Sequence, residues 1–178
     1  MFWGSTGADL PADAIVVIDV GANRRSDYMD WLGPSDGANA SHAGSKWLVA
    51  FEPNPSIAQQ HQNHPRLAFF EAAVGKTSNH VDYLPFHTSE LDYCGSLMPL
   101  LGREHADKHG LSGGVRGCMA SDSMEPIQVP VIRLASVLQA FPRNQEVLLL
   151  KIDAQGGDLA VLESAGADLR RVQRILVE

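Results

Sequence analysis

The chain has 178 residues, enough for one domain with a sizeable hydrophobic core, and we predict a single domain over residues 1–178. Hydrophobic residues make up 44% of it and charged residues 20%, as in ordinary globular domains. The formal net charge of −7 argues against a nucleic-acid partner, because phosphate backbones are bound by clustered lysine and arginine. No apolar run reaches the ~18 residues of a membrane span, so no membrane partner is expected.

The first predicted element is a buried strand over residues 14–20 that ends in an acid and a turn of small residues. Four apolar residues lead into Asp19, and Gly21 follows shortly after. Glycine permits a tight bend, so the backbone at the end of such a strand can approach a bound nucleotide-like ligand closely.

A helix over residues 26–32 is predicted next, because its aromatic and leucine side chains recur at helical spacing. Residues 33–45 are rich in Gly, Ser, Asn and Ala and predict a surface loop. The second strand, 47–51, ends at Glu52. A carboxylate at the tip of a second parallel strand often binds ribose hydroxyls, since it can accept two hydrogen bonds.

Strands and helices continue to alternate along the chain. Further core strands are predicted over 67–70, 147–152 and 174–178, and further helices over 55–61 and 158–165. This alternation predicts an α/β fold: a Rossmann-type, doubly wound, mostly parallel sheet. Because the chain stops at the last of these strands, we expect the sheet to lack its C-terminal strands.

Residues 76–128 form an insert of different character, with one strand predicted inside it at 81–84 and another at its end, 127–134. Cys94 and Cys118 make neither a close metal-binding or redox pair nor a disulfide scaffold. A reducing compartment is therefore the simpler interpretation, and a cytoplasmic location is expected.

Two other features have ordinary interpretations. His105 and His109 are four residues apart, but no third ligand is evident nearby, and no metal is predicted. Lys151, at the end of an apolar strand, is interpreted as an exposed structural lysine.

Four segments, taken together and in order, resemble FkbM-like methyltransferases over about residues 15–178. They are IDVGAN at 18–23, FEPNP at 51–55, VPVIRL at 129–134 and LKIDAQGGD at 150–158. Each is a weak signal alone, but four in order are fairly specific. Members of this family use S-adenosylmethionine and act mostly on hydroxyl groups.

The resemblance implies a cofactor, S-adenosyl-L-methionine, across the carboxyl ends of the first two strands. Asp19 would set the glycine turn near the methionine portion, and Glu52 would accept from both ribose hydroxyls. The cofactor-binding residues that the resemblance implies are Asp19, Gly21, Ala22, Asn23, Glu52, Pro53, Ala72, Ala73 and Asp153. Asp153 is the leading candidate to accept or orient the acceptor proton, and His87, which can titrate near neutral pH, is the second. The insert 76–128 would cover the acceptor.

Two departures from the family pattern keep alternatives open. Arg25 stands where a glycine is usual, and Gln155 where a glutamate is usual. We expect an O-methyltransferase acting on a small-molecule or glycan hydroxyl. One alternative is a cofactor-binding module without transfer activity, and another is a fragment that binds no ligand because its sheet is incomplete. A nicotinamide-dependent oxidoreductase is disfavoured, since residues 21–26 lack the third glycine of the dinucleotide pattern.

Overall fold

The main sheet of the computed structural model has five parallel strands in the order β3-β2-β1-β7-β8. The strands are β1 (Ile15–Val20), β2 (Lys46–Phe51), β3 (Leu67–Phe70), β7 (Val147–Ile152) and β8 (Ile175–Val177). The structure describes residues 10–11, 14–33, 46–61, 63–89, 91, 94–99, 102–110, 112–114, 118 and 125–178. The predicted α/β fold with a Rossmann-like parallel sheet is confirmed, while most of the loop predicted at 33–45 lies outside the described residues.

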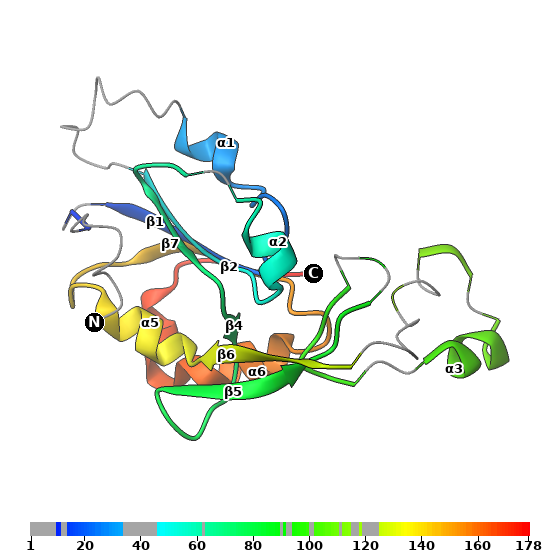
Figure 1. Ribbon diagram of the computed structural model, residues 1–178. Helices are drawn as coiled ribbons and strands as arrows, with labels where there is room; N and C mark the ends of the chain where they lie inside the picture. The colour runs from blue at the N-terminus through cyan, green and yellow to red at the C-terminus, as the bar shows by residue number, and fades with distance from the viewer. Residues whose placement is uncertain are drawn as a thin grey trace.

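Helices cover both faces of this sheet. α5 (Leu134–Ala140) and α6 (Asp158–Ala165) lie together on one face, and α6 continues into a 3-10 helix, Gly166–Arg171 (Figure 1). α1 (Met29–Leu32) packs on the other face. Because neither face of β1 and β2 meets water, both strands are almost continuously apolar.

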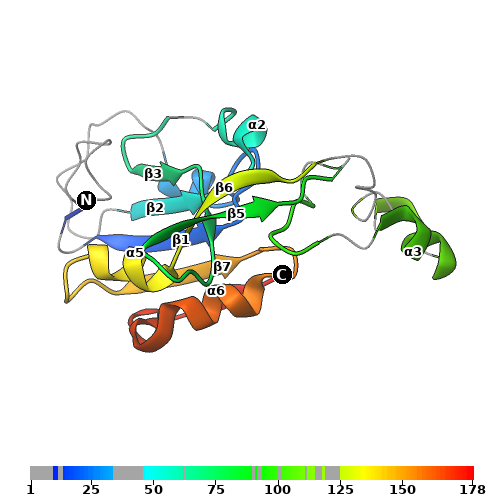
Figure 2. The same cartoon turned by 60° about the horizontal axis from the view of Figure 1, so that its bottom comes forward.

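A second, three-stranded sheet lies alongside the main sheet (Figure 2), and its residues Val74 and Ile132 pack into the same hydrophobic core. It consists of β4 (Ala73–Val74), β6 (Ile127–Ile132) and β5 (Val81–Phe86). β4 pairs with β6 in parallel, and β5 pairs with β6 antiparallel. α3 (Gly102–Lys108) lies apart from both sheets in Figures 1 and 2. Of the predicted insert 76–128, β5 and the first two residues of β6 belong to this second sheet.

Several predicted element boundaries differ from the structure; the strand predicted at 81–84, for example, extends to Phe86. The helix predicted from residue 26 begins at Met29, because the Ser26 hydroxyl bonds to Asp19 and also accepts from the Tyr28 amide at 3.2 Å. α2 (Pro55–Ala58) begins as predicted, with the Asn54 side chain as its cap, but ends before 61. The strand predicted over 127–134 ends at Ile132, since the chain enters α5 at residue 134.

The interpretation of the two cysteines as unpaired is also wrong. Cys94 and Cys118, 24 residues apart in sequence, are joined by a disulfide. Short-range spacing could not reveal this pair, because only the fold of the insert brings the two residues together. Disulfides persist mainly in oxidising compartments, so the cysteines no longer support a cytoplasmic location.

Helices in the described part of the chain are too short, or too polar, to cross a lipid bilayer.

Candidate functional site

A cavity of about 250 Å³ opens at the carboxyl ends of the main strands. From β1 the chain leads outward through β2 and β3 on one side, whereas β7 and β8 lie on the other, so the strand order reverses beside β1. Open α/β sheets bind ligands at this point, because the loops that leave neighbouring strands there diverge. The cavity is lined by Val20, Gly21, Asn23, Phe51, Glu52, Pro53, Ala72–Lys76, Leu84, Phe86, Gly95, Leu97, Met98, Asp153–Gly157 and Ala160.

The turn after β1 is held between the ends of its two neighbouring strands. The amides of Gly21 and Ala22 both donate to the carbonyl of Phe51, at 3.0 and 2.9 Å. Gly21 has a φ of +80°, and a Cβ there would overlap the backbone carbonyl of Asp153. Only glycine fits, for its conformation and for the closeness of the two backbones.

Glu52, directly after β2, is buried at the edge of the cavity. One carboxylate oxygen accepts from the Asn54 amide at 2.8 Å, and the other accepts from the Asn23 amide at 3.0 Å. Burial raises the pKa of Glu52, and these two backbone hydrogen bonds oppose the shift. A carboxylate has about four acceptor positions, so two remain for the hydroxyls of a ligand.

Asp19 lies beneath the turn and is fully buried. It faces Lys151 across the β1–β7 pair, since the two are register partners, and their charged atoms are 3.5 Å apart. Ser26 donates to the other oxygen of Asp19. Burial raises the pKa of Asp19, while Lys151 and Ser26 lower it. Asp19 therefore stabilises the ends of β1 and β7 below the cavity and does not contact a ligand in it.

The interpretation of Lys151 as an exposed lysine is wrong, because its exposed fraction is only 4%. Its ammonium lies 3.3 Å from the carbonyl oxygen of Gly21 and 3.8 Å from the carboxylate of Asp153. Burial disfavours the charged form and lowers the pKa of Lys151, but the surrounding carboxylates, Asp19 and Asp153 foremost, hold that pKa above its ordinary value. Lys151 is consequently an ammonium that links the ends of two strands.

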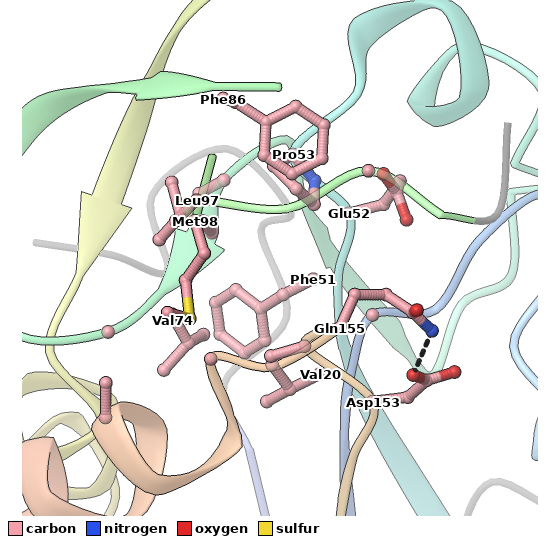
Figure 3. A pocket seen from close by; sticks show the side chains of 18 of the residues that line it. Val20, Phe51, Glu52, Pro53, Val74, Phe86, Leu97, Met98, Asp153 and Gln155 are labelled. Carbon is pink, nitrogen blue, oxygen red and sulfur yellow. Dashed lines mark hydrogen bonds between the residues drawn. The ribbon is translucent and has the colours of Figure 1, made fainter. Parts of the chain in front are cut away.

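Asp153, directly after β7, lines the cavity with a side chain that is 26% exposed. Its Oδ1 accepts a hydrogen bond from the Gln155 amide at 2.6 Å, drawn in Figure 3. The Asp153 backbone amide donates to the carbonyl of Val20 at 2.9 Å, which fixes this loop against the end of β1. A partly solvated carboxylate in this position can contact a cation or accept a hydrogen bond.

The wall opposite the main sheet is apolar. Phe86 at the end of β5 and Leu97 and Met98 from the segment 94–99 face the side chains of Phe51 and Val74 (Figure 3). The segment 94–99 is held by paired backbone hydrogen bonds between Ser96 and His87, at 2.8 and 2.9 Å. This wall suits a flat or apolar ligand group and comes from the predicted insert.

Most of the predicted site residues meet at this cavity. Those that line it are Gly21, Asn23, Glu52, Pro53, Ala72, Ala73 and Asp153. Asp19 lies beneath the turn, and Ala22 in the turn has its side chain packed into the core. Neither residue lines the cavity, nor does His87. Arg25 points to an exposed ion pair with Asp30 at 2.5 Å.

The sequence reasoning did not find Phe86, Leu97, Met98 or the link from Gln155 to Asp153. Gly156 and Gly157 could have indicated a tight loop beside Asp153, whereas the apolar wall residues carry no signal that separates them from core residues.

The residues present fit a nucleoside-containing cofactor. Glu52 has acceptor capacity left for two hydroxyls, the glycine turn allows close backbone approach, and the small side chains of Ala72 and Ala73 leave room for a planar base. Within the described part of the chain, no three His, Cys, Asp or Glu side chains are grouped to hold a metal ion.

Comparison with known families gives one match. The model of the methyltransferase FkbM domain matches residues 19–178, which include both carboxylates that line the cavity. No curated protein and no solved structure matches the chain. A match over this much of the sequence is decisive for family membership: the chain belongs to the FkbM methyltransferase family.

Proposed function

We propose that the chain is an S-adenosylmethionine-dependent methyltransferase that methylates a hydroxyl group of a small molecule or glycan. The observation that carries this proposal is the meeting of Glu52 and Asp153 in one cavity at the carboxyl edge of the sheet, on either side of the glycine turn. Membership of a methyltransferase family supports a methyl donor as the ligand.

Glu52 would hold the cofactor by its ribose. Its two free acceptor positions match a pair of neighbouring hydroxyls, and its two backbone hydrogen bonds fix the carboxylate before the ligand arrives. Ala72 and Ala73 would lie along the adenine edge, where small side chains leave room for a ring. Bound S-adenosylmethionine supplies an electrophilic methyl group.

Asp153 would act on the acceptor. Methyl transfer to oxygen needs the hydroxyl aligned with the methyl group and relieved of its proton. The Asp153 carboxylate is partly exposed within the cavity and can accept that proton or orient the hydroxyl. We propose Asp153 rather than His87, because His87 does not line the cavity.

The acceptor would enter against the apolar wall formed by β5 and the segment 94–99. These residues belong to the insert 76–128, which separates the core strands β3 and β7 and supplies side chains to the same cavity. An acceptor with an apolar portion beside its hydroxyl would suit this wall.

Calorimetric titration of the purified protein tests the cofactor. We expect binding of S-adenosylmethionine and S-adenosylhomocysteine and none of NAD. A mass spectrum of ligand carried through purification checks the result independently. Failure to bind either adenosyl compound overturns the proposal, and binding of NAD alone would favour an oxidoreductase.

A binding module without transfer activity is the second candidate, because the neutral Gln155 stands where the family usually has a glutamate. A screen of hydroxyl acceptors with radiolabelled methyl donor separates the two. Asp153→Asn is expected to lower transfer more than cofactor binding. Tight binding without label transfer to any acceptor would favour the module.

A further inference from the structure

The Asp153 carboxylate is held from both sides. Oδ1 accepts from the Gln155 side-chain amide at 2.6 Å, and Oδ2 lies 3.8 Å from the Lys151 ammonium. Gln155 itself lines the cavity with Asp153, and the two contacts leave further acceptor positions on the carboxylate. Figure 3 shows the Gln155 side chain turned toward Asp153.

Gln155 reaches Asp153 from an unusual backbone conformation. Its φ is +49°, in the left-handed region that side-chain-bearing residues seldom adopt. Its carbonyl accepts from the Ser96 hydroxyl at 2.8 Å, which ties the loop to the segment 94–99. Surrounding structure must maintain such a conformation, and conformations of this kind cluster at functional sites.

The chemistry of residue 155 matters because Asp153 is a carboxylate. A glutamine amide donates a hydrogen bond to that carboxylate, whereas a glutamate would place a second negative charge beside it. Lys151 already supplies the nearby positive charge, shared with the buried Asp19. The neutral donor at 155 therefore orients Asp153 without altering the charge of the cluster.

We propose that Gln155 is a positioning residue that holds the Asp153 carboxylate toward the ligand cavity. This inference rests on the proposed function, because it requires the methyl donor to bind in this cavity with its sulfur close to Asp153, beside the acceptor hydroxyl on which Asp153 acts. S-adenosylmethionine carries one more positive charge than S-adenosylhomocysteine, at the sulfur. A correctly oriented carboxylate near that sulfur favours the charged ligand over the neutral one.

The test compares the two ligands by calorimetry in wild type, Gln155→Met, Asp153→Asn and the double variant. Met has nearly the length of Gln but cannot donate a hydrogen bond. The measured quantity is the ratio of the dissociation constant for S-adenosylhomocysteine to that for S-adenosylmethionine. Asp153→Asn should lower this ratio by about fivefold, the factor for one pair of unit charges at ~4 Å in water-like surroundings. Gln155→Met should lower it by a smaller factor.

The decisive result is non-additivity. If Gln155 acts through Asp153, then Gln155→Met has no further effect on the ratio in the Asp153→Asn background. Gln139→Met is the matched control, because Gln139 donates to Asp168 at 2.7 Å outside the cavity. It should leave the ratio unchanged.

Failure of the positioning role and failure of the proposed function give different results. An unchanged ratio in Gln155→Met overturns the positioning role, as does an equal change in both backgrounds or an equal loss of affinity for both ligands. Absence of binding by the wild-type protein instead overturns the proposed function itself, and this inference with it.

Discussion

Replacing Glu52 by alanine is the sharpest test of how the site binds its ligand. Glu52 is 7% exposed and accepts from two backbone amides, those of Asn23 and Asn54. Removing the carboxylate takes away the acceptor oxygens that we propose bind the ribose hydroxyls. We expect the free energy of cofactor binding to weaken by ~1–3 kcal/mol, which is about 5-fold to 150-fold in the dissociation constant.

The same substitution affects stability, and the two effects must be measured apart. Two amides lose their acceptor, which costs free energy, while the cost of burying a carboxylate with a raised pKa is relieved. We expect a net loss of about 1–3 kcal/mol in the free energy of unfolding. Denaturant unfolding without ligand gives this value, and calorimetry with S-adenosylhomocysteine, well below the unfolding midpoint, gives the affinity.

Two further variants complete this test. Glu52→Gln keeps one acceptor oxygen, so its stability should lie between those of wild type and Glu52→Ala. Glu146→Ala removes an exposed carboxylate that accepts from Gln173 outside the cavity, and should leave affinity unchanged. A folded Glu52→Ala protein that binds the cofactor as tightly as wild type would refute the ribose assignment.

Three other predictions concern the support of the site. Gly21→Ala should lower the free energy of unfolding by about 2–5 kcal/mol, because the strain of a positive φ adds to the overlap of the new Cβ with a neighbouring carbonyl. Gly110→Ala is the control: Gly110 also has a positive φ but nothing near its Cβ, so only the strain of about 1–2 kcal/mol is expected. Equal losses in the two variants would argue against the overlap. Lys151→Met leaves the Asp19 carboxylate buried without its cation and should lower the free energy of unfolding, measured in urea, by about 3–5 kcal/mol. Adding Asp19→Asn should recover part of that lost free energy. No recovery would mean that the two residues are not coupled. Partial burial lowers the pKa of His61, so stability that is fully present above the ordinary pKa of 6.5 is lost as the pH falls through the lowered pKa. His61→Phe keeps the ring that stacks on Phe69, and it should reduce the difference between the urea midpoints measured at about pH 7.5 and about pH 5.5. A difference as large as in the wild type would contradict this.

The strands of the main sheet could be predicted from the sequence because they are buried on both faces. The run 147–152 and the run 15–20 are apolar almost throughout, and each ends in an acid or a small-residue turn. Parallel strands share one carboxyl edge, so acids at their ends fall near one another whatever the rest of the chain does. Local composition and strand order therefore predicted the fold and the neighbourhood of Glu52 and Asp153.

The contacts inside that neighbourhood depended on register and on distant segments. Lys151 is buried because pairing of β1 with β7 places it opposite Asp19, 132 positions earlier, and no local pattern encodes that register. The apolar wall from the segment 94–99 and the disulfide from Cys94 to Cys118 arise only when the insert folds back over the sheet.

The sequence by itself determined which residues are apolar, where strands end and which loops need glycine, since these follow from local side-chain chemistry and backbone sterics. Only the tertiary structure decided which charges are paired, which carboxylate is open to a ligand and which side chains enclose it. Those properties depend on distances between segments far apart along the chain, and packing sets these distances.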